Sequence, residues 1–196
     1  MPYKLGVRGW MSENELKIIE ILAQTVPENG TIVEIGSMMG RTACAWAMSA
    51  HPSVKIYCLD MWGEELIDSP HNLPLQEIEN SGYPKLEDIN SIETFRKNTF
   101  EFSQIFPIKV TDPNTIPEEL HTLNTDLVFI DAGHKNPNDW NIISMWIKKL
   151  NQGGILCGHD YNLEFPDVIE NVKRLEYILG IKCILYPHTS IWRFDV

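Results

Sequence analysis

The 196-residue sequence lacks any apolar run near the roughly 18 residues that a membrane span requires. Its first residues, MPYKLGVRGWMSENEL, contain no apolar core of a secretory signal. The four cysteines are widely spaced and form no CxxC pair, so we expect reduced, buried thiols rather than disulfides. These absences together predict a cytoplasmic protein with no membrane partner.

Concentrated positive charge is also missing. The formal net charge is -11, and the Lys and Arg residues are scattered along the chain. Binding to a phosphate backbone needs a concentrated basic surface, so we expect no nucleic-acid partner. The content of 43% hydrophobic and 22% charged residues is ordinary for a globular protein of this length. We therefore predict a single domain over residues 1–196.

Short apolar segments alternate with helical patterns along the chain. We expect strands at TIVEIG (31–36), VKIYCLD (54–60), FPIKVTD (106–112), TDLVFIDAG (125–133), GILCGHDYN (154–162), IKCILYP (181–187) and TSIWRFDV (189–196). We expect helices within 11–30, 37–50, 91–105, 136–154 and 165–180, and a weak helix or turn at 117–124. Ser12 and Glu15 have the spacing of a capping box at the start of the first helix, and Gly153-Gly154 suggests the stop of the fourth. This alternation, closed by a terminal hairpin, predicts a three-layer α/β domain with a mostly parallel sheet.

The pattern fails between residues 61 and 90, where proline, glycine, acidic residues and isolated aromatics follow one another without a period. A loop of this length inside a compact domain is usually functional. We expect it to be a lid insertion that covers an acceptor and excludes water.

Two strand ends early in the chain offer a ligand site. VEIGSMMGR places Gly36 and Gly40 between a strand and a helix, where a ligand can approach the backbone and the helix N–H groups. Asp60 closes the next strand, where a carboxylate can accept hydrogen bonds from a ribose. A tight turn and a helix cap are the structural alternatives, and the residues alone leave both open.

Two later strand ends carry ionisable side chains. FIDAGHKN sets Asp131 and His134 three residues apart after one strand, and GHDYN sets His159 and Asp160 after the next. The carboxyl ends of parallel strands meet at one edge of a sheet, where ligands bind. Each residue could instead cap a helix or its own loop. Convergence on adjacent strand ends favours a functional site.

VEIGSMMGR, CLDMWGE, DLVFIDAGHKN and GGILCGHDYN resemble the successive motifs of class I S-adenosylmethionine-dependent methyltransferases. The resemblance runs from about Trp10 to the final strand. It implies a Rossmann-like fold, with a seven-stranded sheet whose last strand is antiparallel. It also implies S-adenosylmethionine as cofactor, with contacts assigned to the methionine side (Glu34, Gly36, Ser37, Gly40), the ribose (Asp60) and the adenine end (Asp112).

FIDAGH and GHDYN further resemble small metal-assisted O-methyltransferases of the macrocin type. That resemblance implies Asp131 and Asp160 as ligands of Mg²⁺, Asp131 beside both cofactor and acceptor, and His134 as the proton acceptor. His159 stands where those enzymes usually have an acidic residue. As a metal ligand, its imidazole would suit Mn²⁺, Fe²⁺ or Zn²⁺ better than Mg²⁺. The alternative is a neighbouring branch of the same superfamily, in which a His-Asp-Tyr ending is usual and implies no metal.

The leading hypothesis is therefore a methyltransferase acting on a hydroxyl of a small molecule, such as a sugar or a glycosylated metabolite. One rival is a metal-dependent hydrolase that uses the same acidic and histidine residues to activate water. Another is a non-catalytic protein of the same fold that binds an adenosine-containing ligand. The sequence leaves open whether the chain forms a homo-oligomer.

Overall fold

The computed structural model describes residues 6–63 and 91–196, so the predicted lid at 61–90 lies almost wholly outside the described residues. The helices are α1 (Glu13–Ala23), α2 (Arg41–Ser49), α5 (Ile92–Thr99), α6 (Asn138–Trp146) and α7 (Pro166–Leu179), with short 3₁₀ turns at Glu118–Leu120 and Ile147–Lys149. The strands are β1 (Thr31–Ile35), β2 (Lys55–Asp60), β3 (Ile105–Lys109), β4 (Thr125–Ile130), β5 (Leu150–Gly158), β6 (Ile184–Leu185) and β7 (Trp192–Asp195).

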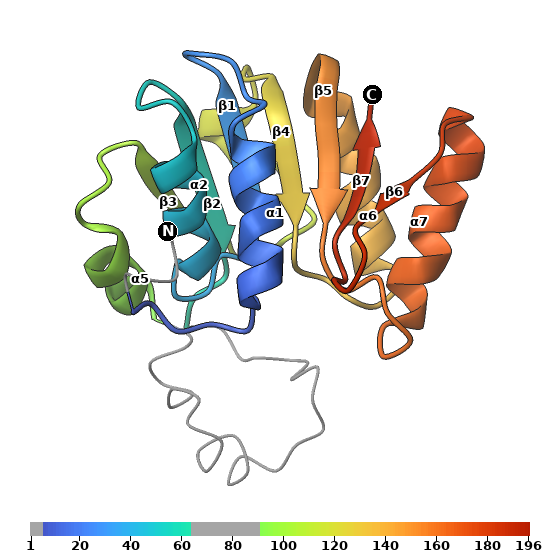
Figure 1. Ribbon diagram of the computed structural model, residues 1–196, viewed down its shortest axis with the longest axis horizontal. Coiled ribbons are helices and arrows are strands. Elements are labelled where there is room, and N and C mark those ends of the chain that lie inside the picture. The colour runs from blue at the N-terminus through green and yellow to red at the C-terminus, as the bar shows by residue number, and fades with distance from the viewer. Residues whose placement is uncertain (1–5, 64–90) are drawn as a thin grey trace, which may run out of the picture.

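The seven strands form one sheet in the order β3-β2-β1-β4-β5-β7-β6. β1 to β5 pair in parallel, whereas β7 is antiparallel to both β5 and β6. The arrowheads of the central parallel strands therefore lie at one edge of the sheet, the lower edge in Figure 1. The predicted mostly parallel, seven-stranded α/β fold with an antiparallel last strand is confirmed.

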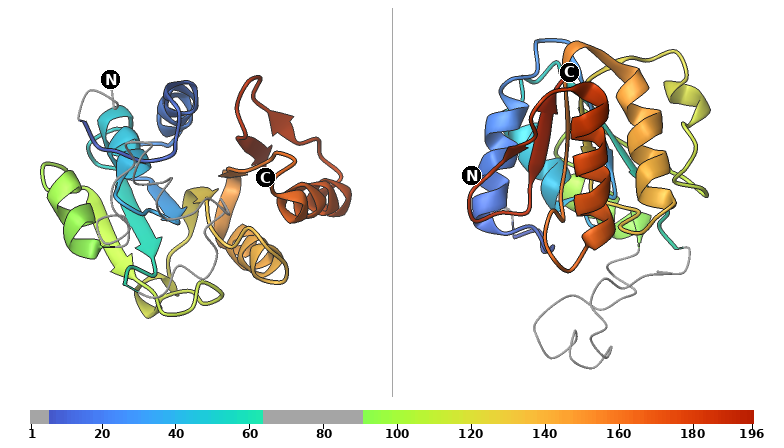
Figure 2. Two further views of the ribbon diagram at one scale, coloured as in Figure 1. Left: turned by 90° about the horizontal axis from the view of Figure 1, so that it is seen from below. Right: turned by 90° about the vertical axis from the view of Figure 1, so that its right-hand side faces the viewer.

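Helices cover both faces of the sheet. Viewed along the strands, α1, α2 and α5 lie on one face, and α6 and α7 on the other (Figure 2). One apolar core, which includes Leu16, Trp46 and Phe129, fills the first layer. A second core, which includes Val128, Ile142 and Trp192, fills the other layer. β4 contributes to both because it is buried on both faces, as its continuous apolar sequence predicts.

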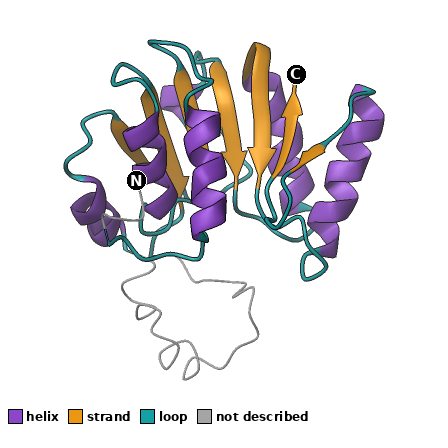
Figure 3. Cartoon of the chain, in the orientation of Figure 1, coloured by secondary structure: helices purple, strands orange, loops and turns teal. Residues whose placement is uncertain are grey.

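Figure 3 shows where helices and strands alternate with loops, and local sequence signals account for the start of α1 and the end of α7. Ser12 and Glu15 form the predicted capping box, in which each side chain accepts a hydrogen bond from the other residue's backbone N–H. Gly180, at φ +67°, ends α7 in the left-handed conformation that favours glycine. No helix in the described part of the chain is long and apolar enough to cross a membrane.

The helix expected within 91–105, whose ends the pattern left open, ends at Thr99, and β3 begins at Ile105. One predicted helix end is wrong. The helix expected over 136–154 ends at Trp146, and β5 runs from Leu150 through Gly153 and Gly154, which the pattern had suggested as a helix stop. Pairing overrides the pattern there, since the backbones of Gly153 and Gly154 hydrogen-bond to Val196.

Candidate active site

The glycine loop that follows β1 lies against the loop that follows β4. Gly36 has φ +92°, and a Cβ atom at this position would overlap the carbonyl oxygen of Asp131. Gly40 has φ +86°, and a Cβ there would lie 2.7 Å from Cγ2 of Thr99 on α5. Close packing therefore requires both glycines, which supports the structural alternative without excluding a ligand. The contact between Gly36 and Asp131 also makes the two predicted sites immediate neighbours.

Met38, in the middle of the glycine loop, is held through its backbone. Its N–H donates to Oδ2 of Asp60 at 2.8 Å, and its carbonyl accepts from Nε1 of Trp62 at 2.7 Å. The side chain of Asn98 holds the next carbonyl, that of Met39, at 2.9 Å. The loop is thus fixed by Asp60 at the end of β2, by Trp62 just after it, and by Asn98 on α5.

Asp60 lies at the end of β2, as predicted, with its carboxylate turned toward the glycine loop. Burial raises the pKa of this carboxyl group, while the backbone N–H groups of Met38 and Trp62 act in the opposite direction. Oδ1 accepts from the Trp62 N–H at 3.2 Å. The backbone N–H groups of Met61 and Ser37 act on the same carboxylate in the same direction, so a ribose at Asp60 would share its roughly four acceptor positions with backbone donors.

Glu34 points into the core beneath the glycine loop and is fully buried. Its Oε2 accepts from the Cys58 thiol at 3.4 Å, and its Oε1 has no hydrogen-bond partner among the described residues. Burial, reinforced by the charge of Asp131, raises the pKa of Glu34 to about 8, although Ser37 and Cys58 act to lower it. Glu34 is therefore a neutral acid at pH 7.

Replacing Glu34 with glutamine is expected to remove a pH-dependent loss of stability. The pKa of Glu34 rises from 4.5 to about 8 on folding, so the native state binds its proton more tightly. Its contribution is complete below pH 4.5 and disappears as the pH rises through about 8. Urea denaturation at several pH values should show the wild type losing about 5 kcal/mol more than Glu34→Gln across this range, because a difference of one pKa unit corresponds to about 1.4 kcal/mol. Parallel stability curves for the two proteins would contradict the assignment.

Three of the predicted residues meet beyond β4 and β5. Asp131, His134 and Asp160 each offer one ligand atom, and these atoms lie within 4.8 Å of one another. Nε2 of His134 is 2.7 Å from Oδ2 of Asp160 and 3.8 Å from Oδ1 of Asp131. That nitrogen is buried and makes no aligned hydrogen bond to any described residue. Asp160 itself has φ +62°, a left-handed conformation that is uncommon for residues other than glycine.

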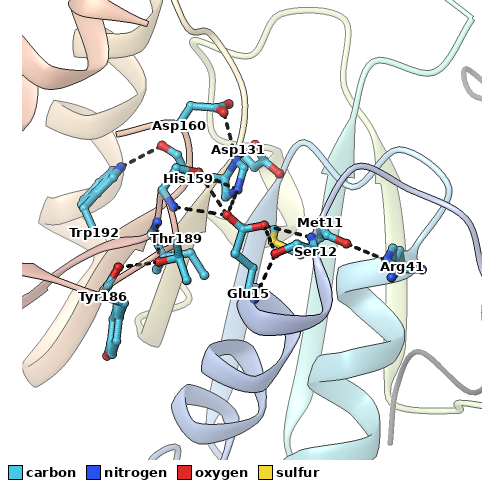
Figure 4. A network of polar contacts seen from close by, with 12 residues as sticks. Met11, Ser12, Glu15, Arg41, Asp131, His159, Asp160, Tyr186, Thr189 and Trp192 are labelled. Carbon is cyan, nitrogen blue, oxygen red and sulfur yellow. Dashed lines mark hydrogen bonds and ion pairs between the residues drawn. The ribbon is translucent and has the colours of Figure 1, made fainter. Parts of the chain in front are cut away.

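His159 lies beside this group, with one ring nitrogen facing the two aspartates and the other facing Glu15 (Figure 4). Its Nδ1 is 3.0 Å from Oδ1 of Asp160 and 3.6 Å from Oδ1 of Asp131. Its Nε2 is 2.9 Å from Oε1 of Glu15 and 2.8 Å from the hydroxyl of Ser190. Because both of its nitrogens make these contacts, His159 helps to hold the two aspartates in place.

The carboxylates control the protonation of both histidines. Burial alone would lower the pKa of His134, but contacts with Asp131 and Asp160 outweigh it and raise the pKa to about 10. For His159 burial is likewise outweighed, by Asp131, Asp160 and Glu15, and the pKa rises to about 11. The histidines in turn hold the pKa of Asp160 below its usual range, despite its burial. Without another cation, both imidazoles therefore carry a proton at pH 7.

The donor set fits a divalent cation. Two carboxylate oxygens and one imidazole nitrogen converge, and that nitrogen is buried without an aligned hydrogen bond. Oxygen ligands suit Mg²⁺, whereas a set that includes nitrogen suits Mn²⁺, Fe²⁺ or Zn²⁺ better. The structure brings His134 into one group with Asp131 and Asp160. Nδ1 of the predicted ligand His159 also lies 3.0 Å from Asp160 and 3.6 Å from Asp131, so its role as a ligand stays a prediction.

Residues 33–161 match the model of a family described as a methyltransferase domain. The chain belongs to this methyltransferase family. The match spans β1 to β5 and therefore includes the glycine loop, Asp60 and the ionisable group. With the observed strand order, it confirms the resemblance to class I S-adenosylmethionine-dependent methyltransferases. A comparison with curated protein sequences finds no match.

Solved structures share the fold at low sequence identity. Cofactor-bound Rv0187 from MTB has a TM-score of 0.67 and 16% identity, over 100% of this chain and 85% of that one. CalS11, a TDP-rhamnose 3'-O-methyltransferase of calicheamicin biosynthesis, has a TM-score of 0.60 and 14% identity, over 94% and 81%. A SAM-dependent O-methyltransferase from Thermotoga maritima, TM0748, has a TM-score of 0.59 and 14% identity, over 88% and 53%. The present chain thus spans about half the length of this last relative.

Asp112 follows β3 in the methyltransferase and is exposed. Its Oδ1 accepts from the backbone N–H of Asn114 at 2.8 Å and from the Asn114 side chain at 3.0 Å. The residue thus closes a turn of its own loop. Its contact with the adenine end of a cofactor stays a prediction.

Glu15 and Trp62 are the residues of this region whose roles the sequence did not reveal. The capping-box spacing identified Glu15 correctly as a cap, but its second oxygen reaches His159, 144 residues along the chain. From the sequence, Trp62 is an aromatic residue next to a motif, whose ring could cover the cofactor or a substrate, with packing as the favoured role. It does pack, with its ring centroid 4.9 Å from that of Phe95, and it also donates to the glycine loop.

Proposed function

We propose that this methyltransferase transfers the methyl group of S-adenosylmethionine to a hydroxyl of a small molecule, with a divalent cation at Asp131, His134 and Asp160. The observation that carries the proposal is the direct contact between Gly36 and the backbone of Asp131. Because β1, β4 and β5 are neighbours in the sheet, a cofactor on the glycine loop would lie beside the ionisable group.

Different residues of the chain would bind S-adenosylmethionine and the cation. Gly36, Ser37 and Gly40, with Glu34 below them, would face the methionine part, and Asp60 would accept hydrogen bonds from the ribose. S-adenosylmethionine supplies an activated methyl group, so the protein's task is to place a nucleophilic oxygen in line with it. Asp131 also lies next to the glycine loop and so would contribute to both sides.

The cation would be held by Asp131 and Asp160, with His134 as the third donor or as the proton acceptor. A bound divalent cation lowers the pKa of a coordinated hydroxyl. It would also offset the two negative charges that raise the pKa of His134 to about 10. Only an imidazole without its proton can accept one, so a basic role for His134 requires this compensation.

A sugar hydroxyl is the acceptor class that we favour. CalS11, which shares the fold, is described as acting on TDP-rhamnose. The acidic character of the chain, with a formal net charge of -11, agrees with a small acceptor rather than a nucleic acid. Single-domain organisation over residues 1–196 is part of the same proposal.

The test is formation of S-adenosylhomocysteine with a panel of nucleotide sugars and glycosides, followed by mass spectrometry of the acceptor. Each reaction is run with Mn²⁺, with Mg²⁺ and with a chelator. We expect a mass gain of one methyl group on a hydroxyl acceptor, and loss of turnover in the chelator. Methylation of a nitrogen or carbon atom would refute the O-methyltransferase proposal, and turnover unaffected by chelator would refute the metal.

A further inference from the structure

We infer that Trp62 is a positioning residue for the cofactor, because its indole N–H holds the glycine loop in the shape that binds the ligand. The inference rests on the proposed function, since it assumes that S-adenosylmethionine binds on this loop. Nε1 of Trp62 donates to the carbonyl of Met38 at 2.7 Å, between the two glycines of the loop. Trp62 acts through Met38 and needs no contact with the cofactor.

The backbone of Met38 needs such support. Its φ is +44°, in the left-handed region that is unfavourable for a residue with a side chain. Strained conformations of this kind persist only where the surroundings determine them. Asp60 fixes the N–H of Met38 and Trp62 fixes its carbonyl, so both polar groups of the residue are held from the end of β2.

The indole is well placed to act as a rigid support. Trp62 is 1% exposed and packs against Phe95 in the core under α2 and α5. A buried side chain of this size has little freedom to move away from its acceptor. Asn98 holds the following carbonyl, so loss of the indole N–H would loosen the loop without releasing it completely.

A second buried tryptophan provides a matched control. Trp146 on α6 is also 1% exposed, but it lies in the core on the opposite face of the sheet. Its Nε1 has no hydrogen-bond partner among the described residues. Trp146→Phe therefore removes the same atoms from a similarly buried site without touching the glycine loop.

The experiment is calorimetric titration of S-adenosylmethionine into the wild type, Trp62→Phe and Trp146→Phe, with thermal denaturation of each protein. Both variants should unfold at a lower temperature, because each leaves a cavity. Only Trp62→Phe should bind the cofactor more weakly, by about tenfold, because the Met38 carbonyl loses its donor and the loop must be ordered on binding.

A subtler replacement covers the case in which Trp62→Phe does not fold. β-(3-Benzothienyl)alanine at position 62 keeps the size of the indole and replaces its N–H by sulfur, and we expect the same loss of affinity. The inference would be overturned if either variant at position 62 bound the cofactor within about twofold of the wild type. It would also be overturned if Trp146→Phe lost as much affinity as Trp62→Phe. Both results would leave the proposed function intact. A wild type that does not bind S-adenosylmethionine would overturn both the inference and the proposed function.

Discussion

Replacing His134 with alanine is expected to lower methyl transfer at least about 100-fold while leaving the affinity for S-adenosylmethionine unchanged. The side chain lies with Asp131 and Asp160 beyond β4 and β5, outside the glycine loop. Removing it would take away either the proton acceptor or one donor to the cation. Neither loss touches the loop or Asp60, so the measurement pairs initial rates with calorimetric titration of the cofactor.

The affinity for Mn²⁺ separates the two roles of His134. If the imidazole is a ligand, His134→Ala should weaken Mn²⁺ binding about tenfold or more, because one of three donors is lost. If it is the proton acceptor alone, Mn²⁺ should bind as in the wild type. Full turnover in His134→Ala would show that the residue has neither role.

Replacing Asp60 with alanine is expected to weaken S-adenosylmethionine binding by about 100-fold. Hydrogen bonds to a charged group contribute about 1.5–3 kcal/mol each, and a carboxylate can accept from both hydroxyls of a ribose. The same substitution removes the acceptor that holds the N–H of Met38 at 2.8 Å, which further loosens the glycine loop. Calorimetry measures the loss.

Asp126 supplies the matched control for Asp60. Its Oδ2 accepts from the backbone N–H of Thr31 at 2.8 Å, at the opposite end of β1. Asp126→Ala therefore removes a partly buried carboxylate that holds backbone, but at the edge of the sheet remote from the predicted site. We expect it to cost stability and to spare cofactor affinity. A normal affinity in Asp60→Ala would remove the basis for placing the ribose at β2.

The sequence predicted the fold well because its signals are local. Thr125–Ile130 is a continuous apolar segment and forms a strand buried on both faces. Ser12 and Glu15 mark the start of α1 correctly. The wrong helix end lies where strand pairing decides the structure, at Gly153 and Gly154, whose partner is Val196. No window of sequence around residue 150 contains that information.

The sequence indicated which residues form the candidate site better than it indicated how they are arranged. Strand order brings Asp131, His134 and Asp160 together, as adjacent strand ends indicated. The position of His159 depends on Glu15, a residue of α1 that only the folded chain brings near. The hydrogen bond from Trp62 to Met38 likewise depends on the path of the chain after β2. These two contacts depend on side-chain direction and on residues far apart in the sequence. No local sequence pattern reveals them.

The central claim is that the glycine loop and Asp60 bind S-adenosylmethionine beside a metal-assisted site. Calorimetric titration of the cofactor into the wild-type protein, with Mn²⁺ and with a chelator, tests it most directly. We predict binding at one site per chain, with Asp60→Ala weakened about 100-fold in the same experiment. Absence of binding in both conditions would contradict the claim.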